Sequence, residues 1–167
     1  DRLRPMTQGN IYFDHNATTP PSEATLKSLP EWLAHWGNPS SIHQQGRGPK
    51  RILREARRNL AQFFQCHPLE LVFTSGGSEA NNLALQGCLL AQKKSSHFQR
   101  RRVLIGALEH PSVLKQIPWL KDQGFQVETI PVDQQGRYCL KTYESLLNED
   151  VALVSVMLAN NEVGVLA

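Results

Sequence analysis

The chain has 167 residues, of which 40% are apolar and 20% are charged, and its formal net charge is +3. This composition is typical of a folded globular protein and excludes an intrinsically disordered chain. Its basic side chains are mostly scattered and are not interleaved with aromatic ones, so we expect no nucleic-acid partner. No apolar run approaches the roughly 20 residues that a membrane span requires, so we expect no membrane association.

Cysteine usage and the first residues indicate the compartment. Cys66, Cys88 and Cys139 are far apart in the sequence and form no C-x-x-C pair. An odd number of cysteines with this spacing argues against both a disulfide framework and a zinc site, so we expect no metal. Residues 1–10 lack the apolar stretch of a signal peptide, and we interpret them as an N-terminal tail in which Met6 is a candidate native start. A reducing, cytoplasmic location is the simplest interpretation.

The segment 11–48 is expected to contain one helix and the loops that surround it. Ser22 can cap a helix that extends to Leu29, and Pro30 is expected to interrupt or restart this helix. Residues 37–41 (GNPSS) are rich in turn-forming side chains and predict a loop.

Residues 49–167 are expected to form an incomplete α/β domain. It begins with an amphipathic helix that starts at Pro49 and ends before Cys66, because apolar side chains recur at helical spacing opposite a face of arginines. Four strands and three helices alternate after it. We predict strands at 70–74, 103–107, 125–130 and 151–158, and helices at 79–92, 111–123 and 142–147.

This alternation predicts the fold class. The last strand, 151–158, is apolar on both faces, which is typical of an interior strand in a parallel sheet covered by helices. Gly124 fits the position directly after a helix. We therefore expect a three-layer α/β/α domain with a mainly parallel sheet and right-handed crossovers. In such a sheet ligands bind at the carboxyl ends of the strands, where several polar motifs of this chain fall.

The most distinctive motif is the sequence TSGGS at residues 74–78, between a predicted strand and a predicted helix. Two glycines permit a tight turn with free backbone N–H groups, and these groups, the helix dipole and the Ser78 hydroxyl together can bind an anion. No G-K-[ST] follows, so a phosphate ester fits better than a nucleoside triphosphate. The alternative is a plain glycine turn in which Ser78 caps the helix.

Four weaker motifs complete the set. The sequence EHP at 109–111 places His110 at a strand end, where it can stack on a ligand ring and titrate near neutral pH, or simply begin a helix. The sequence NNEVG at 160–164 can bind polar ligand groups or be ordinary turn chemistry. The sequences DHNATTP at 14–20 and GNPSS-x-H-x-x-G at 37–46 are polar loops.

Together and in this order, DHNATTP, GNPSS-x-H-x-x-G, VFTSGGSEANN, EHPSV and NNEVG resemble the motifs of the cysteine desulfurase group. That group belongs to the class V aminotransferases, which are pyridoxal 5'-phosphate (PLP) enzymes of fold type I. The resemblance extends from about Ile11 to the last residue. It implies that this α/β domain is part of the large PLP-binding domain of fold type I and that the full-length protein binds PLP.

The resemblance also implies roles for individual residues. Gly77 and Ser78 match the turn that binds the PLP phosphate, where the family often has threonine in place of Ser78. His110 matches a histidine that stacks on the pyridine ring and takes part in proton transfer, and Asn161 matches an asparagine beside cofactor and substrate. Four further residues match positions near the substrate or the active-site entrance, toward a partner subunit: Ala17, Thr18, Asn38 and Asn160.

The implied reaction removes sulfur from L-cysteine, which passes to a protein cysteine as a persulfide while alanine is released. A homodimer, sulfur-acceptor proteins and a place in iron–sulfur cluster assembly are implied with it. Two alternatives stay open: another class V enzyme such as a selenocysteine lyase, and a non-catalytic truncated module that acts in assembly. An α/β nucleotide-binding domain is disfavoured because G-x-G-x-x-G is absent.

The chain lacks the Ser-x-His-Lys segment whose lysine holds PLP in this family, and none of its cysteines matches the nucleophile. We therefore expect either a fragment of a longer protein or a natural truncation, inactive by itself in both cases. The apolar end at 165–167, which has no polar tail, favours a fragment.

Overall fold

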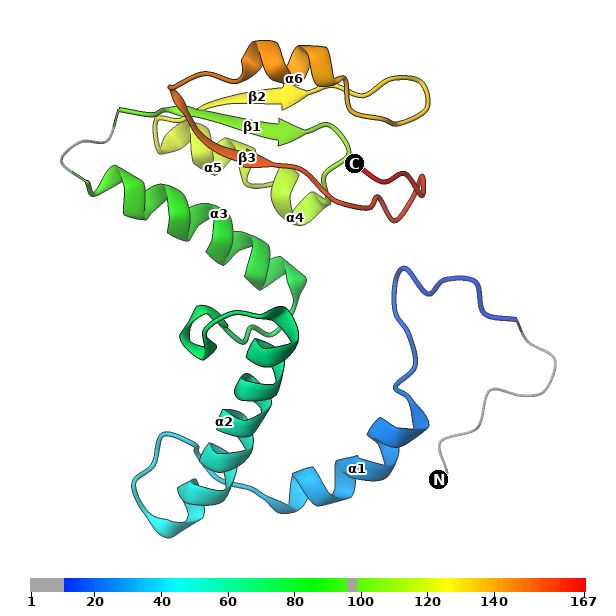
Figure 1. Cartoon of the computed structure of the whole chain (residues 1–167), viewed down its shortest axis with the longest axis vertical. Coiled ribbons are helices and arrows are strands. Elements are labelled where there is room, and N and C mark those ends of the chain that lie inside the picture. Colours follow the sequence, from blue (N-terminus) through cyan, green and yellow to red (C-terminus); the bar gives the residue numbers. More distant parts are fainter. Residues whose placement is uncertain (1–10, 96–98) are drawn as a thin grey trace. The chain divides into compact units, whose positions relative to one another are not determined.

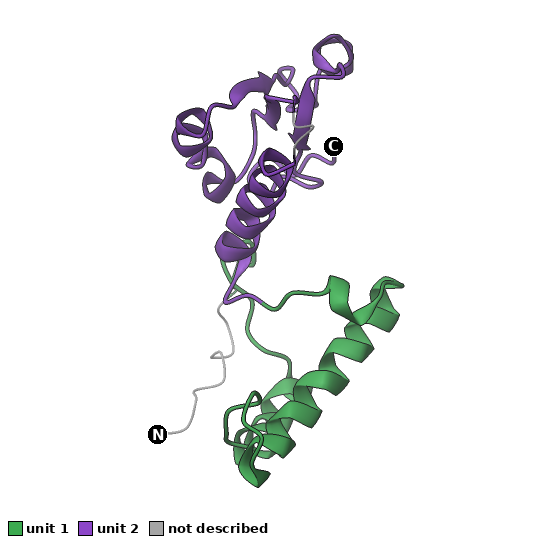
Figure 2. Ribbon diagram, turned by 90° about the vertical axis from the view of Figure 1, so that its left-hand side faces the viewer, with its two compact units in different colours: residues 1–73 green, residues 74–167 purple. Residues whose placement is uncertain are grey.

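The computed structural model describes residues 11–95 and 99–167. The chain divides into two compact units, an N-terminal unit that ends at Phe73 and a C-terminal unit that begins at Thr74 (Figure 2). These units are defined by packing, and the functional division expected at residue 48 stays a prediction. Among the described helices, none is both long and apolar enough to cross a bilayer.

The N-terminal unit contains helix α1 (Glu23–Ala34), helix α2 (Gln44–Phe64) and the 3₁₀ turn η1 (Pro68–Glu70). The predicted cap is confirmed, because Ser22 Oγ accepts a hydrogen bond from the Thr25 amide at 3.1 Å. The prediction that Pro30 interrupts this helix is wrong, since α1 continues through it to Ala34. Proline leaves the Leu26 carbonyl without its helical donor, and Leu26 is exposed enough for water to replace that donor.

Helix α2 begins at Gln44, five residues before the predicted start at Pro49. Pro49 has no N–H for the carbonyl of Gln45, and this carbonyl instead lies against Gly37, where a Cβ would come within 2.5 Å of it. Gly46 is equally close to the predicted loop, because a Cβ there would lie 2.6 Å from the Ser41 carbonyl oxygen. The GNPSS loop therefore packs on the first turns of α2, and glycine permits both approaches.

The strand predicted at 70–74 is absent from the structure. Residues 68–70 form η1, and residues 71–74 have no regular secondary structure. Leu71 is extended (φ −94°, ψ 126°), but Val72 and Phe73 are 65% and 44% exposed. Apolar and β-branched side chains favour an extended backbone, whereas a strand also needs a neighbour to pair with, and no described segment provides one.

The C-terminal unit alternates helices with three parallel strands, which confirms the predicted α/β fold. The strand order is β2-β1-β3, and β1 pairs in parallel with both neighbours (Figure 1). Its elements are α3 (Gly77–Lys93), β1 (Arg102–Gly106), α4 (Pro111–Leu114), α5 (Ile117–Asp122), β2 (Gln126–Ile130), α6 (Leu140–Leu146) and β3 (Val151–Ser155).

In the C-terminal unit, two predicted elements differ from those observed by more than a shift of one or two residues at their ends. The helix predicted at 111–123 is broken into α4 and α5. Pro118 explains the break, because it cannot donate to the carbonyl of Leu114, which is the last residue of α4. The last strand ends at Ser155 rather than 158. Gly124 follows α5 with φ +87°, in the left-handed region predicted for it.

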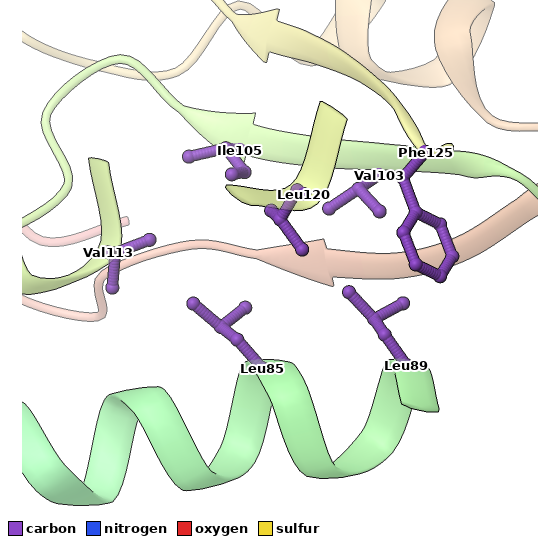
Figure 3. Close-up of a cluster of buried hydrophobic side chains, with 7 residues drawn as sticks. All are labelled: Leu85, Leu89, Val103, Ile105, Val113, Leu120 and Phe125. Atoms are coloured by element: carbon purple, nitrogen blue, oxygen red, sulfur yellow. The ribbon is translucent and has the colours of Figure 1, made fainter. Parts of the chain in front are cut away.

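The sheet is covered on both faces, as the three-layer prediction requires. On one face Val103 and Ile105 of β1 pack with buried side chains of α3, α4 and α5 and with Phe125 (Figure 3). On the other face Leu104 packs with Ile130 and Val151 beneath α6. Alternate residues of β1 thus enter opposite cores, because successive side chains of a strand point to opposite faces.

Candidate active site

A pocket of about 270 Å³ opens beyond the carboxyl ends of β1 and β3. One wall is the segment 107–111 that follows β1, and the other is the segment 160–163 that follows β3. The structure therefore brings His110, Asn160 and Asn161 to one pocket, although up to 51 residues separate them in the sequence. This is the edge of the sheet where ligands bind in open α/β folds.

His110 is the N-cap of α4, and its ring is exposed at the pocket. Its Nδ1 accepts a hydrogen bond from the Ser112 amide at 3.0 Å and lies 2.7 Å from Ser112 Oγ. The capping role and the ligand-binding role are compatible, because the cap uses only Nδ1. The ring face and Nε2 are left for a ligand.

The side chain of Asn160 forms hydrogen bonds to both walls of the pocket. Its Nδ2 donates to the Leu108 carbonyl at 3.0 Å, across the pocket from one wall to the other. Its Oδ1 accepts from the amides of Glu162 and Val163 at 2.9 and 2.8 Å. Asn161 is exposed and lines the pocket. The geometry thus favours Asn161 for ligand contact and gives Asn160 a positioning role.

The sequence did not predict that an acid in the pocket wall is buried. Glu109 is only 7% exposed, and it is the buried charged residue of the described core. Ser155 Oγ, at the end of β3, donates to its carboxylate at 3.1 Å. This contact spans 46 residues of sequence, so no local pattern could have indicated it.

Tyr138 lies close to this acid. Its hydroxyl is buried and has no hydrogen-bond partner among the described residues. The pKa of Tyr138 is raised, first by burial of its hydroxyl and then by the nearby Glu109 carboxylate. The Leu108 backbone amide lowers this pKa in part, although it is not placed well enough to form a hydrogen bond with the hydroxyl. The ring packs against Gly106, where a Cβ would lie 2.9 Å from two ring carbons.

Replacing Tyr138 with phenylalanine is expected to stabilise the C-terminal unit by about 1 kcal/mol at neutral pH, because it removes a buried hydroxyl without a partner. A raised folded-state pKa contributes stability that is present below the ordinary value of about 10 and is lost as pH rises through the raised value. The variant should therefore lose less stability above about pH 10. Urea unfolding of the variant and of the parent chain, at neutral pH and above about pH 10, checks both expectations.

Tyr143→Phe is the matched control, because Tyr143 packs on the same buried cluster. It is expected to change stability by less than about 0.5 kcal/mol. A Tyr138→Phe variant that is less stable than the parent chain at neutral pH would show that the hydroxyl has a partner in solution.

The glycine turn lies at the N-terminus of α3 and does not line the pocket of His110. A Cβ built on Gly76 or Gly77 would meet no atom within 4 Å, so the space over the turn is open. No described residue accepts a hydrogen bond from the Gly77 or Ser78 amide. The first turn of a helix with free amides and open space attracts an anion.

The side chain of Glu79 binds Ser75, at the start of this turn. Its carboxylate accepts hydrogen bonds from the hydroxyl and the amide of Ser75, both at 2.6 Å. These bonds hold the pKa of Glu79 below its usual value, so the side chain is ionised and folded back on Ser75. The Gly77 and Ser78 amides are thereby left to an outside anion.

A hydrogen-bond contact links the turn to His110. Asn81, one helical turn after Gly77, donates from Nδ2 to Ser112 Oγ at 2.8 Å, and Ser112 in turn contacts His110. The residues of the C-terminal unit are therefore compatible with PLP, because the open turn at Gly77 and Ser78 could hold a phosphate and the exposed ring of His110 could lie against a pyridine ring.

The other predicted site residues belong to the N-terminal unit. The amides of Ala17 and Thr18 donate to the Asp14 carbonyl at 3.1 and 3.3 Å, which forms a turn. Asn38 Oδ1 accepts from the Ser40 amide at 2.8 Å. Their closeness to the pocket stays a prediction. Within the described residues, no group of three His, Cys, Asp or Glu side chains could hold a metal ion.

The family profile described as aminotransferase class V matches residues 11–167. The chain belongs to the class V aminotransferase family, which is PLP-dependent. This identification confirms the resemblance that the ordered motifs indicated.

Relatives within the family are cysteine desulfurases. Cysteine desulfurase IscS 1 of Archaeoglobus fulgidus is 40% identical over 154 residues, which cover 92% of this chain and 39% of that protein. Cysteine desulfurase NifS of Azotobacter vinelandii is 39% identical over 159 residues, covering 94% of this chain and 38% of that protein. The chain thus spans about two fifths of the length of these relatives.

Solved structures agree in fold. A NifS-like protein superposes with a TM-score of 0.85 at 34% identity, over 93% of this chain and 42% of that one. A second structure, SspA in complex with cysteine, has a TM-score of 0.79 at 28% identity, over 90% of this chain and 43% of that one. The fold of the chain is that of NifS-like PLP enzymes of fold type I.

Proposed function

We propose that the protein carrying this chain is a PLP-dependent cysteine desulfurase and that this chain supplies part of its cofactor site. The observation that carries the proposal is the placement of His110 and Asn161 in one pocket beyond β1 and β3, linked through Ser112 and Asn81 to the open glycine turn. Relatives named cysteine desulfurase, and a structure described as containing cysteine, support L-cysteine as the substrate.

Each residue has a separate task in this proposal. Gly77 and Ser78 hold the phosphate with backbone N–H groups and a hydroxyl, and His110 covers one face of the pyridine ring. Asn161 contacts polar groups of cofactor or substrate, while Asn160 keeps the two walls of the pocket together. Bound PLP supplies an electron sink for bonds to the α-carbon of the amino acid. The described lining of the pocket contains no lysine, so the proposal requires the lysine that attaches the cofactor to come from outside this lining.

Large apolar side chains at the surface support burial against further protein. Phe13, Ile42 and Leu158 are 86%, 94% and 75% exposed. Single exposed apolar residues are ordinary, but the N-terminal unit also exposes Trp36 and Phe63 at 76% and 78%. A homodimer, in which Ala17, Thr18 and Asn38 face the partner's site, accounts for this exposure. Sulfur-acceptor proteins, iron–sulfur cluster assembly and a cytoplasmic location complete the proposal.

The test uses the full-length protein reconstituted with PLP. We expect a yellow protein that releases alanine and, with a thiol reductant, sulfide in equal amounts from L-cysteine. A yellow protein that ignores cysteine but acts on selenocysteine would move the activity to selenocysteine lyase. A stable, colourless oligomer that takes up no PLP would instead favour the non-catalytic module.

A further inference from the structure

Two donors converge on one nitrogen of His110. The Ser112 amide lies 3.0 Å from Nδ1, and the Ser112 hydroxyl oxygen lies 2.7 Å from the same atom. An amide N–H can only donate, so Nδ1 carries no hydrogen and accepts. In the neutral ring the hydrogen must then be on Nε2, because one nitrogen of a neutral imidazole is always protonated.

Asn81 sets the direction of the hydroxyl hydrogen. Its Nδ2 donates to Ser112 Oγ at 2.8 Å, across 31 residues of sequence. Because Oγ accepts from Asn81 on one side, its own hydrogen is free to point toward Nδ1 of His110 on the other. The three groups form a directed chain from Asn81 through Ser112 to His110.

The helices that carry this chain are held together by a second polar contact. Gln86 of α3 donates from Nε2 to Oε1 of Gln116 at 2.7 Å, where Gln116 directly precedes α5. Both Asn81 and Ser112 are partly shielded from water, so the contact between them is not an exposed surface pair. The spacing between α3 and α4 is therefore fixed along one polar seam.

We propose that Ser112, directed by Asn81, is a positioning residue that fixes His110 as the Nε2–H tautomer. The neutral ring can then donate a hydrogen bond from Nε2, but it has no free lone pair to act as a base at Nδ1. A proton on Nδ1 would point directly at the Ser112 N–H. The significance for catalysis rests on the proposed function, whereas the tautomer itself does not.

The tautomer can be read in this chain without cofactor, with ¹⁵N-histidine labelling and long-range proton–nitrogen correlation at a pH where the ring is neutral. We expect His110 to show an acceptor-type Nδ1 signal and a hydrogen-bearing Nε2. His67 is an internal reference, because among the described residues its Nδ1 accepts the Leu69 amide, at 3.3 Å, and no hydroxyl. A His110 with hydrogen on Nδ1, or with the mixed tautomers of free histidine, would overturn the proposal.

Two variants test the two links. Ser112→Ala keeps the amide donor and removes the hydroxyl, so the Nδ1 signal should shift toward that of His67, and Ser112→Thr should restore it. Asn81→Asp replaces the donor by an acceptor that draws the Ser112 hydrogen away from Nδ1, so it should cause the same shift. It therefore tests the relay even if Ser112→Ala does not fold.

Asn82→Asp is the matched control, which makes the same change of charge one residue away. The Asn82 side-chain amide donates to the Ser78 carbonyl and does not contact Ser112. The variant should leave the His110 signals unchanged. An Nδ1 signal unaltered by both Ser112→Ala and Asn81→Asp would reject the relay, even in a protein that proves to be a cysteine desulfurase. Conversely, the tautomer would stand if the full-length protein acted on another substrate.

Discussion

Replacing His110 with asparagine in the full-length protein is expected to lower kcat for L-cysteine by roughly 10²- to 10³-fold, the usual cost of removing one positioned hydrogen-bond donor from an active site. The structure makes asparagine the informative choice. Asparagine is a favoured N-cap, so its side-chain oxygen can accept the Ser112 amide in place of Nδ1. The variant therefore removes the ring while preserving the start of α4, and kcat can be measured on a folded protein by alanine release.

His110→Ala separates the two roles of the side chain. It removes both the ring and the cap, so it should match His110→Asn in kcat and be less stable by about 1 kcal/mol. If His110→Asn retained turnover within a few fold of the parent enzyme, His110 would be a helix cap only. That outcome would leave the proposed PLP binding at Gly77 and Ser78 untouched.

How well the sequence predicted the fold depended on whether the cause was local. The apolar run at 151–155 correctly indicated a parallel strand. The prediction that this strand is interior is wrong for the described sheet, because β3 lies at its edge and pairs only with β1 there. The break between α4 and α5 was also local, since Pro118 stands four residues after Leu114, and applying the proline rule there would have found it. The segment 70–74 failed because a strand depends on a partner that local composition cannot reveal.

In the candidate site, too, features with a local cause were predictable and features that depend on packing were not. His110 and Asn161 follow β1 and β3, and neighbouring parallel strands bring their carboxyl ends together, so their meeting was predictable once the fold was known. Asn81 and Ser112 lie in two of the quoted motifs, but the sequence did not indicate their contact, because it depends on how α3 packs beside α4. Asn160 was expected near substrate, but only coordinates show that its amide group is occupied by the backbone on both walls.

Because Asn160 makes three backbone hydrogen bonds, Asn160→Ala is expected to destabilise the C-terminal unit by about 3 kcal/mol, at roughly 1 kcal/mol for each bond. That loss corresponds to a fall in Tm of about 6 to 12 °C for a chain of this size. Asn160→Asp keeps the acceptor for Glu162 and Val163 and loses the Nδ2 donor, which contacts the Leu108 carbonyl at 3.0 Å and, more weakly, Met157 Sδ at 3.7 Å. It should therefore cost about 1 to 2 kcal/mol.

Asn161→Ala is the adjacent control and is expected to cost less stability than Asn160→Ala, because the Asn161 side chain is exposed. Hydrogen exchange locates the effect: the Asn160 and Ala167 amides, which donate to the carbonyls of Val165 and Leu158 at 2.9 Å, should exchange faster in Asn160→Ala. If Asn160→Ala and Asn161→Ala were equally stable, the bonds across the pocket would not hold its walls together. The graded order alanine, aspartate, asparagine at 160 instead identifies the Leu108 contact as one separable part of that support.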